Sequence, residues 1–235
     1  MKIKKLTATI TSFRDLSPTA REITIELPES LDFTAGAFVN TFFDVAGETI
    51  RRAYSISSDE NDQRHITLSI RKVPSGKAAE FFWKPDIVGS TISIMGPLGI
   101  NTADKLTKRR LFLFGFGIGI SVIMAMLRHA LERNDINEIV VMTGARDESE
   151  SIYLDEIQKL TQTNKQVTLR QVLSRPHHPK AFGSRTGYIQ DHIDGFTFDD
   201  ADVYVCGHKA ACDSLVETIQ KTHPSECVFH VEAFG

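Results

Sequence analysis

The chain has 235 residues, of which 41% are hydrophobic and 24% charged, a composition typical of a globular protein with one large or two modest domains. The formal net charge of −3 gives no electrostatic reason to expect a nucleic-acid partner. Cys206, Cys212 and Cys227 match neither a C-x-x-C nor an iron–sulfur spacing, which indicates a reducing compartment and no cluster bound by this chain.

No segment has the pattern of a signal peptide or a spanning helix. The N-terminal residues lack the apolar core of a signal peptide. Residues 111–127 are uncharged, but Gly115, Gly117 and Gly119 interrupt them, and a buried strand, a turn and a buried helix explain this segment better. We therefore expect a cytoplasmic protein without membrane insertion.

Apolar and polar side chains alternate through much of the first hundred residues, as they do in half-buried strands. We predict a helix at 77–84 and six strands, with the last strand ending at the turn Gly96-Pro97-Leu98-Gly99: 3–13, 22–27, 36–45, the segment that contains Arg52 and Tyr54, 65–73 and 90–95. These elements predict a six-stranded antiparallel β-barrel, which we assign to residues 1–104.

The pattern changes in residues 105–235, where apolar strands alternate with helical segments. Residues 111–114 form a continuous apolar run of the kind found in buried parallel strands. Further strands are expected at 138–143, 166–173, 202–206 and 227–231, and helices at 121–133, 153–160 and 210–221. This alternation predicts an α/β domain built on a doubly wound parallel sheet.

The segment Arg51-Arg52-Ala53-Tyr54-Ser55 combines an anion-binding side chain with an aromatic ring. On a strand, Arg52 and Tyr54 project from one face and Ala53 and Ser55 from the other. A guanidinium suits a phosphate, and Tyr54 offers a flat apolar surface with a polar tip. A ligand with a phosphate and an aromatic ring fits this pair, although for the motif taken by itself a plain strand with a surface arginine and a half-buried tyrosine is the favoured explanation.

Two glycine-containing turns precede predicted helices. Gly115 to Ser121 lies between the first parallel strand and its helix, where backbone N–H groups favour a pyrophosphate. Ile120 stands at the third glycine of the usual G-x-G-x-x-G pattern, so a simple packing turn remains an alternative. Ser75 to Ala78 opens the barrel's helix, either as a second phosphate cradle or as an ordinary helix start.

Other candidates stand at the ends of predicted parallel strands, where ligands bind in such sheets. They are Cys206-Gly207-His208 and Ser174-Arg175, with a turn glycine and a solvated loop as the respective alternatives. The eight histidines have no spacing that suggests a metal site, and we expect His177 and His178 to lie in a loop.

In this order, the motifs resemble those of the ferredoxin–NADP reductase superfamily over nearly the whole chain. Arg52 to Ser55 matches R-x-Y-S, Gly96 to Gly99 matches G-P-x-G, and Gly115 to Val122 loosely matches A-G-G-x-G-I-T-P. A C-G strand end and a C-terminal E-x-F are matched by Cys206-Gly207 and by Glu232-Ala233-Phe234.

The resemblance implies bound FAD, with NADH or NADPH as co-substrate. It implies that Arg52 binds the flavin phosphate, Tyr54 stacks on the isoalloxazine, Ser55 lies near N5, and Phe234 shields the other flavin face. The catalytic candidates are Ser55, Cys206, Glu232 and Phe234. The implied cofactor-binding residues are Arg52, Ala53, Tyr54, Ser55, Ile70, Arg71, Lys72, Gly76, Lys77, Ala78, Ala79, Gly117, Ile118, Gly119, Ser121, Arg146, Ser174, Arg175, Cys206, Gly207, His208 and Phe234.

The chain departs from the family pattern at a few of these positions. Ala79 stands where Ser or Thr usually meets the pyrophosphate, which removes a hydrogen bond worth about 1 kcal/mol. Phe116 replaces a glycine, Val122 a proline, and His208 stands where proline is common. FMN fits less well than FAD, because FMN-binding relatives tend to have G-P-R-N at Gly96 to Gly99.

The resemblance implies a reductase that passes a hydride from nicotinamide to FAD and then single electrons to a separate ferredoxin, oxygenase component or haem protein. A flavin reductase that uses free flavin as a substrate is the alternative, followed by a non-catalytic electron-transfer subunit. The coenzyme stays open, because Arg146 and Arg175 suit a 2′-phosphate whereas Asp147 and Glu148 oppose it.

Overall fold

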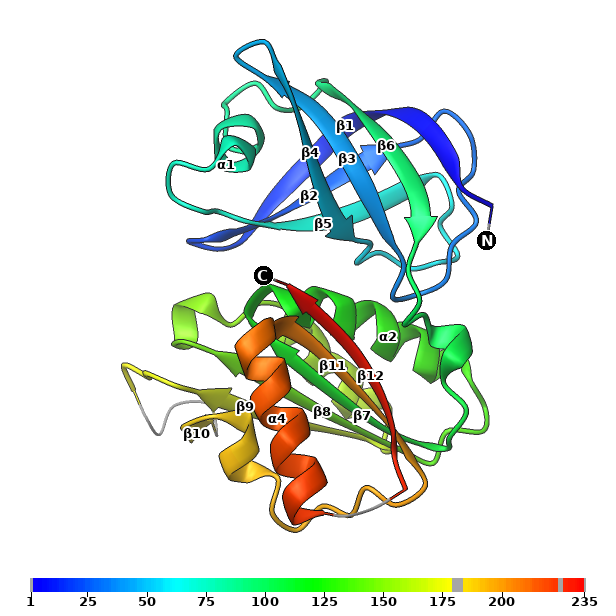
Figure 1. Cartoon of the computed structure of the whole chain (residues 1–235), viewed down its shortest axis with the longest axis vertical. Helices are drawn as coiled ribbons and strands as arrows, with labels where there is room; N and C mark the ends of the chain where they lie inside the picture. The colour runs from blue at the N-terminus through cyan, green and yellow to red at the C-terminus, as the bar shows by residue number, and fades with distance from the viewer. Residues whose placement is uncertain (1, 179–183, 224–225, 235) are drawn as a thin grey trace. The chain divides into compact units, whose positions relative to one another are not determined.

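The computed structural model describes residues 2–178, 184–223 and 226–234. Six antiparallel strands form the first sheet (Figure 1), in the order β4-β3-β6-β1-β2-β5. Their bounds are β1 Lys4–Ser17, β2 Ala20–Glu26, β3 Phe38–Val45, β4 Glu48–Ser55, β5 His65–Arg71 and β6 Thr91–Leu98. The predicted antiparallel six-stranded architecture is confirmed.

The two outer strands of this sheet approach each other and bring it close to a closed barrel. A β-bridge joins Ile56, just after β4, to Leu68 of β5, and the Ser57 N–H donates to the Thr67 carbonyl over 2.9 Å. Inward-facing residues of alternating strands fill the interior, as Ile23, Ile25 and Leu68 are fully buried.

The helix α1 (Lys77–Phe82) packs on this barrel through two aromatic side chains. Phe81 and Phe82 are buried, and their ring centroids lie 4.7 and 4.9 Å from that of Phe43 on β3. Such tilted and edge-on aromatic pairs stabilise packing beyond the area they bury. Their burial explains why the segment after β5 forms a helix here.

The first strand extends beyond its predicted end. β1 continues past Phe13 to Ser17, because Arg14 pairs with Glu22 at 3.1 Å and Asp15 with Arg21 at 2.7 Å across the β1–β2 hairpin. These polar pairs interrupt the apolar alternation from which the strand was predicted, yet they hold the ladder together.

The turn predicted at Gly96-Pro97-Leu98-Gly99 is wrong in its position, since β6 runs through Gly96 and Pro97 to Leu98. Opposite this segment, the register with β3 shifts between Phe38 and Asn40. Proline lacks the N–H that a regular ladder requires, and such a register irregularity is where a strand tolerates it.

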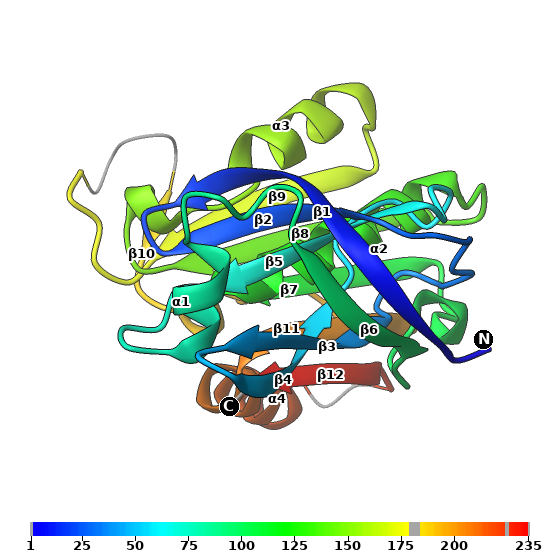
Figure 2. The ribbon, with the colours of Figure 1, turned by 90° about the horizontal axis from the view of Figure 1, so that it is seen from above.

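A parallel sheet forms the second part of the chain, with the strand order β10-β9-β8-β7-β11-β12. The strands are β7 Arg110–Phe116, β8 Glu138–Ala145, β9 Val167–Leu173, β10 Arg185–Thr186, β11 Ala201–His208 and β12 Val228–Phe234. Figure 2 lets the reader follow the order from β9 through β8, β7 and β11 to β12. The predicted doubly wound sheet is confirmed, and the two-residue β10 was too short to predict.

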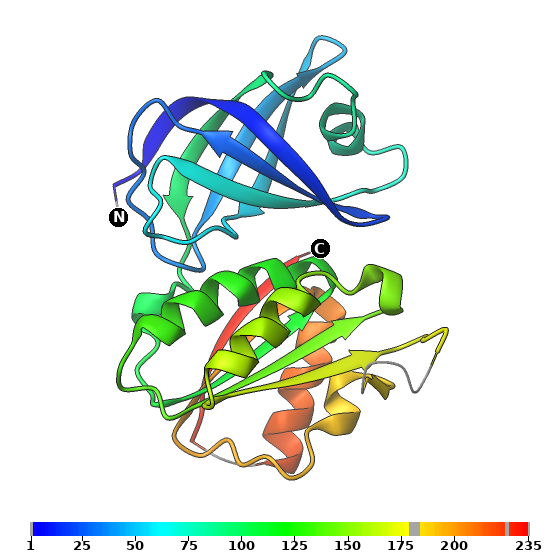
Figure 3. The same ribbon diagram turned by 180° about the vertical axis from the view of Figure 1, so that it is seen from behind.

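Helices cover both faces of this sheet. The helix α4 (Lys209–Thr222) lies on one face, and α2 (Ile120–Glu132) and α3 (Leu154–Thr163) lie on the other (Figures 1 and 3). The chain proceeds from β7 to β8 and β9 in one direction and returns to β11 and β12 on the other side of β7. The carboxyl ends of β7 and β11 therefore form the topological switch point, where such sheets bind ligands.

The chain divides into two compact units, Met1–Ala103 and Asp104–Gly235. Each has its own apolar core, one built from the barrel strands with α1 and the other from the parallel strands with the face of α4. No helix among the described residues has the length and apolar character needed to cross a bilayer.

Candidate functional site

In the first unit, the Arg52 and Tyr54 side chains lie on the same strand but have different surroundings. Arg52 is exposed, and its Nη1 donates to the Arg51 carbonyl at 2.7 Å. Tyr54 is half-buried against the barrel core, with its ring edge-on to Phe82 of α1 at a centroid distance of 5.9 Å. The pair thus offers a solvent-exposed guanidinium beside an aromatic ring that is packed against Phe82 and the barrel core.

The protonation state of Tyr54 follows from this packing. Burial raises the pKa of its phenol well above the usual value, and the positive charge of Arg52 opposes part of that rise. Tyr54 is therefore a neutral hydrogen-bond donor throughout the physiological range. A neutral phenol with a fixed ring suits an aromatic ligand with polar edges.

The end of β5 supplies a backbone edge near the same region of the barrel. Ile70 is fully buried, so its side chain faces the core, and both Ile70 and Arg71 pair with β2. On its other side, β5 is joined to the segment after β4 by the Ile56–Leu68 bridge. Among the described residues, no strand pairs with Ile70 and Arg71 on that side. Lys72 differs, because its N–H donates to the Thr19 carbonyl at 2.7 Å.

The predicted pyrophosphate residues stand at the start of α1. Ser75 has a left-handed backbone with φ of 58°, Gly76 is the N-cap, and no side chain caps the helix. Lys77 forms an ion pair with Glu48 at the beginning of β4. Lys77, Ala78 and Ala79 are the first helical residues, whose N–H groups have no partner within a helix.

In the second unit, the glycine loop packs backbone to backbone against the end of β11. A Cβ at Gly119 would overlap with the Cys206 carbonyl, and a Cβ at Gly207 would lie 2.6 Å from that of Phe116. Gly117 and Gly207 also have positive φ, 54° and 150°. The structure thus brings Gly117 to Gly119 together with Cys206 and Gly207 at the switch point, with no side chain between them.

Three neighbouring residues serve this arrangement in different ways. Ser121 is buried, and its hydroxyl donates to the Ile118 carbonyl at 2.8 Å, so here it supports the loop. Phe116 fills the space left by Gly144 and Gly207 on the adjacent strands. His208, the last residue of β11, is exposed.

Cys206 and Glu232 occupy adjacent strands as register partners of β11 and β12. Cys206 is fully buried, and burial, with a further contribution from the Glu232 charge, raises the pKa of its thiol well above the usual value. The thiol therefore stays protonated. Glu232 is half-buried and accepts a hydrogen bond from the Tyr204 hydroxyl at 2.9 Å. Phe234 pairs with His208 at the end of the ladder.

The residues expected on the adenosine side meet at the ends of β8 and β9. The Ser174 N–H donates to the Ala145 carbonyl at 3.0 Å, and the Arg175 N–H donates to the Arg146 carbonyl at 2.7 Å. These bonds bring Arg146, Ser174 and Arg175 together. They lie along the same sheet edge as Cys206 but on the other side of β7 in the strand order.

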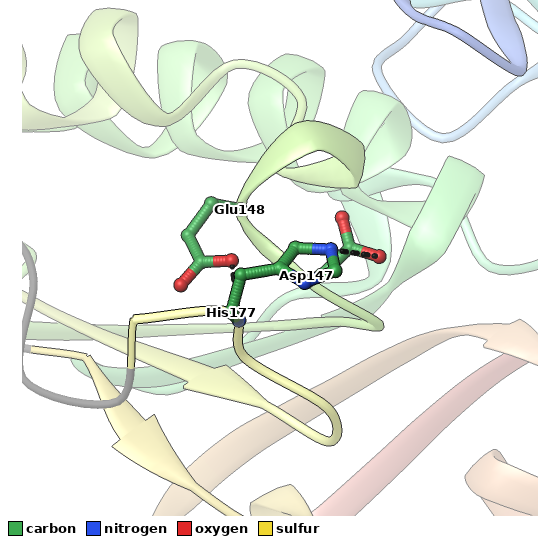
Figure 4. Close-up of side chains that lie close together, drawn as sticks. All are labelled: Asp147, Glu148 and His177. Atoms are coloured by element: carbon green, nitrogen blue, oxygen red, sulfur yellow. Dashed lines mark hydrogen bonds and ion pairs between the residues drawn. The ribbon is translucent and has the colours of Figure 1, made fainter.

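Two carboxylates directly follow Arg146 in the chain, and Figure 4 shows them, Asp147 and Glu148, together with His177. Glu148 accepts hydrogen bonds from the N–H groups of His177 and His178 at 3.0 and 2.9 Å, and these bonds lower its pKa to about 2. Asp147 accepts bonds from the Ser149 hydroxyl and N–H, which likewise lower its pKa. Both side chains are thus ionised at neutral pH.

Sequence reasoning missed two features of these sites. The position of Tyr204, two residues before Cys206 on the same face of β11, was the only signal for its contact with Glu232. No spacing indicated that one ligand atom each from Asp147, Glu148 and His177 would lie within 4.8 Å of one another. Their approach depends on the loop that returns after β9.

Comparisons with known proteins assign a family to each unit. The family described as "Oxidoreductase FAD-binding domain" matches residues 7–102, and "Oxidoreductase NAD-binding domain" matches residues 113–217. Among curated proteins, ferredoxin–NADP reductase B of Sorangium cellulosum is 29% identical over 210 residues, 85% of each chain.

Further relatives are longer than this chain. The phenol hydroxylase P5 protein of Acinetobacter pittii is 26% identical over 97% of this chain, which spans 65% of that protein. This chain spans 64% and 56% of the length of two further relatives.

Solved structures give the same assignment. The Amycolatopsis cytochrome P450 reductase GcoB has a TM-score of 0.89 at 25% identity, over 99% of this chain and 70% of that one. A Neisseria gonorrhoeae ferredoxin NADP+ reductase, solved with bound FAD and NADP, has the same fold with a TM-score of 0.82 at 17% identity, over 98% of this chain and 99% of that one. Together with the two family matches, these likenesses show that the chain belongs to the ferredoxin–NADP reductase superfamily.

Proposed function

We propose that this protein is an NAD(P)H-dependent flavoprotein reductase that delivers electrons to a separate acceptor protein. The observation that supports the proposal is that one chain carries two candidate ligand sites: Arg52 and Tyr54 on the barrel, and Gly117 to Gly119 packed against Cys206 and Gly207 at the switch point of the parallel sheet. We assign residues 1–104 to a flavin domain and 105–235 to an NAD(P) domain.

The residues of the first unit fit FAD. Arg52 would hold a phosphate, Tyr54 would bind the ring system, the unpaired edge at Ile70 and Arg71 would border it, and the segment from Gly76 to Ala79 would face the pyrophosphate. Bound FAD would supply the chemistry, accepting a hydride from the nicotinamide and releasing electrons singly. The chain's own residues bind and orient the two nucleotides.

In the second unit, the glycine backbones would admit the nicotinamide nucleotide closely at the switch point. The buried Cys206 thiol, protonated at neutral pH, would support the site from within the sheet, and its half-buried register partner Glu232 would be the side chain open to a ligand. The ionised Asp147 and Glu148 next to Arg146 and Arg175 would repel a 2′-phosphate. We therefore propose NADH as the preferred coenzyme.

The names of the relatives support the choice of acceptor. They include ferredoxin–NADP reductase B, the reductase component of phenol 2-monooxygenase and the cytochrome P450 reductase GcoB. We propose a ferredoxin, an oxygenase component or a haem protein as the acceptor of this chain. The cysteines Cys206 and Cys212 are buried thiols, and together with the need for a nicotinamide coenzyme they support a cytoplasmic location.

Ala79 favours a second candidate, a reductase that uses free flavin as its substrate. It lies in the first turn of α1, where its side chain offers no hydroxyl to a pyrophosphate. A single missing hydrogen bond of about 1 kcal/mol would weaken FAD binding only several-fold. Bound FAD therefore remains the first proposal.

An absorbance spectrum of the purified protein, followed by anaerobic titration with NADH and with NADPH, tests the proposal. We expect a flavin spectrum that bleaches with NADH at a lower concentration than with NADPH. A colourless protein that oxidises NADH only with added free flavin would support the second candidate. Absence of flavin and of NAD(P)H oxidation in both assays would contradict both.

A further inference from the structure

A buried row of polar side chains crosses from β11 to β12 in the second unit. Asp202 accepts a hydrogen bond from the ring of His230 at 2.8 Å, and the Tyr204 hydroxyl donates to Glu232 at 2.9 Å. The Tyr204 and His230 rings stack with centroids 6.3 Å apart and an interplanar angle of 18°. We call these four residues the β11–β12 polar row.

The backbone register gives the row a regular geometry. Asp202 is paired with Val228, and Tyr204 with His230, so each of these β11 side chains bonds to the β12 residue two positions beyond its own register partner. The row therefore runs diagonally toward the carboxyl ends of the strands. Its far end is anchored, because Asp202 also accepts the N–H groups of Thr107 and Lys108 at 2.6 and 2.7 Å.

Glu232, at the end nearest the ligand edge, is the least buried member of the row. Glu232 is half-buried, whereas Tyr204 and Asp202 have no exposed surface and His230 is 6% exposed. A buried phenol needs a partner for its single proton, and a carboxylate accepts a shorter and stronger bond than a neutral group. The Tyr204 ring is buried and stacked on His230, so its hydroxyl has a fixed position from which it donates to the Glu232 carboxylate.

We propose that Tyr204 is a positioning residue that holds the Glu232 carboxylate in place for hydride transfer at the nicotinamide site. This inference rests on the proposed function and extends it to Tyr204, a fully buried residue that bonds to Glu232. Tyr204 is not part of the R-x-Y-S, glycine-loop, C-G or E-x-F motif.

The chemistry of the coenzyme explains why a fixed carboxylate matters. When the C4–H bond of the dihydronicotinamide breaks, the hydride leaves with both electrons to the flavin, which is reduced. The neutral ring becomes NAD+, with one positive charge. A preorganised carboxylate stabilises a charge that develops only during the reaction, so it affects the rate more than the binding of NADH.

The test uses Tyr204→Phe, which removes only the hydroxyl, with stopped-flow reduction of the bound flavin by NADH under anaerobic conditions. We expect the limiting rate to fall roughly tenfold, because the carboxylate is no longer held where the positive charge develops. The dissociation constant of NADH should stay within about twofold, because the ring is neutral in the ground state. Tyr153→Phe, which removes the hydroxyl of another buried tyrosine in the same unit, is the matched control and should keep the wild-type rate.

Glu232→Gln provides the second variant and the double-mutant cycle. If Tyr204 acts through Glu232, the double variant should be no slower than Glu232→Gln alone. Calorimetry on the flavin-free protein gives an independent readout, in which Tyr204→Phe should weaken NAD+ binding several-fold, while the melting temperature should fall by only about a few degrees, as expected for one lost buried hydrogen bond.

A wild-type rate for Tyr204→Phe, or a loss that adds fully to that of Glu232→Gln, would overturn the role of Tyr204. Wild-type protein whose flavin is not reduced by either coenzyme would instead overturn the proposed function. In that case, the NAD+ affinities of the flavin-free variants still decide whether Tyr204 positions Glu232.

Discussion

Adjacent arginines on β4 have different surroundings. Arg51 donates its Nε hydrogen to the Asn40 side chain at 3.2 Å. The hydrogen bond described for the Arg52 guanidinium runs from Nη1 to the Arg51 carbonyl, a backbone group. Arg52 also lies close enough to Tyr54 to influence the pKa of its phenol. The guanidinium of Arg52 is thus the one placed to bind an anion next to an aromatic ligand.

Arg52→Ala should weaken FAD binding, because it removes a charge-assisted hydrogen bond to the phosphate. We expect a loss of about 2 kcal/mol, or roughly thirtyfold in the dissociation constant. The ratio of flavin to protein absorbance after purification and a fluorescence titration of the flavin-free protein measure it. Arg51→Ala is the control and should retain FAD; equal flavin content in both variants would remove Arg52 from the phosphate site.

At the scale of elements, the loops after β8 and β9 are held together by backbone and side-chain bonds. The Arg175 N–H donates to the Arg146 carbonyl, and the Glu148 carboxylate receives the N–H groups of His177 and His178. A carboxylate that accepts two backbone N–H groups is stabilised in its charged form. The loops that flank the proposed adenosine site therefore depend on the ionisation of Glu148.

Glu148→Gln should lower stability at neutral pH. The pKa of Glu148 is lowered from 4.5 to about 2 on folding, so its contribution is fully present above pH 4.5 and is lost as the pH falls toward 2. The difference in melting temperature between wild type and variant should therefore shrink between pH 4.5 and the lowest pH at which the protein stays folded. Glu217→Gln, on the exposed side of α4, controls for the removal of one surface carboxylate. A difference that does not change with pH would exclude this linkage.

Across the whole molecule, each unit has its own core and its own set of candidate ligand residues. Tyr54 and α1 pack against the barrel core, and the core of the second unit supports β7 and β11 at the switch point. A chain organised in this way places the proposed flavin site and the proposed nicotinamide site on separately packed scaffolds.

Hydrogen–deuterium exchange should therefore localise the two ligands to different units. FAD added to the flavin-free protein should slow exchange most in residues 48–55 and 70–79, and NAD+ should slow it most in residues 115–121 and 206–208. Mass spectrometry of peptides from the full chain measures both effects. Protection of one unit alone by both ligands would contradict the assignment of residues 1–104 and 105–235 to separate cofactors.

Local patterns were enough to predict most of the architecture. Strand alternation and the continuous apolar run at 111–114 indicated the two kinds of sheet, because side-chain periodicity reports which faces of a strand are buried. The motifs at Arg52 to Ser55 and at Gly115 to Ser121 indicated ligand sites for a similar reason. Their residue types match the chemistry of a phosphate, an aromatic ring or a closely approaching backbone.

Tertiary structure alone decided the contacts that join distant segments. The bond from Tyr204 to Glu232 depends on the register of β11 and β12, and the capture of the His177 and His178 N–H groups by Glu148 depends on how the loop after β9 returns. The continuation of β6 through Pro97 depends on a register shift against β3. Sequence periodicity is local, whereas these contacts arise only when strands adopt one register and bring residues far apart in the chain within bonding distance.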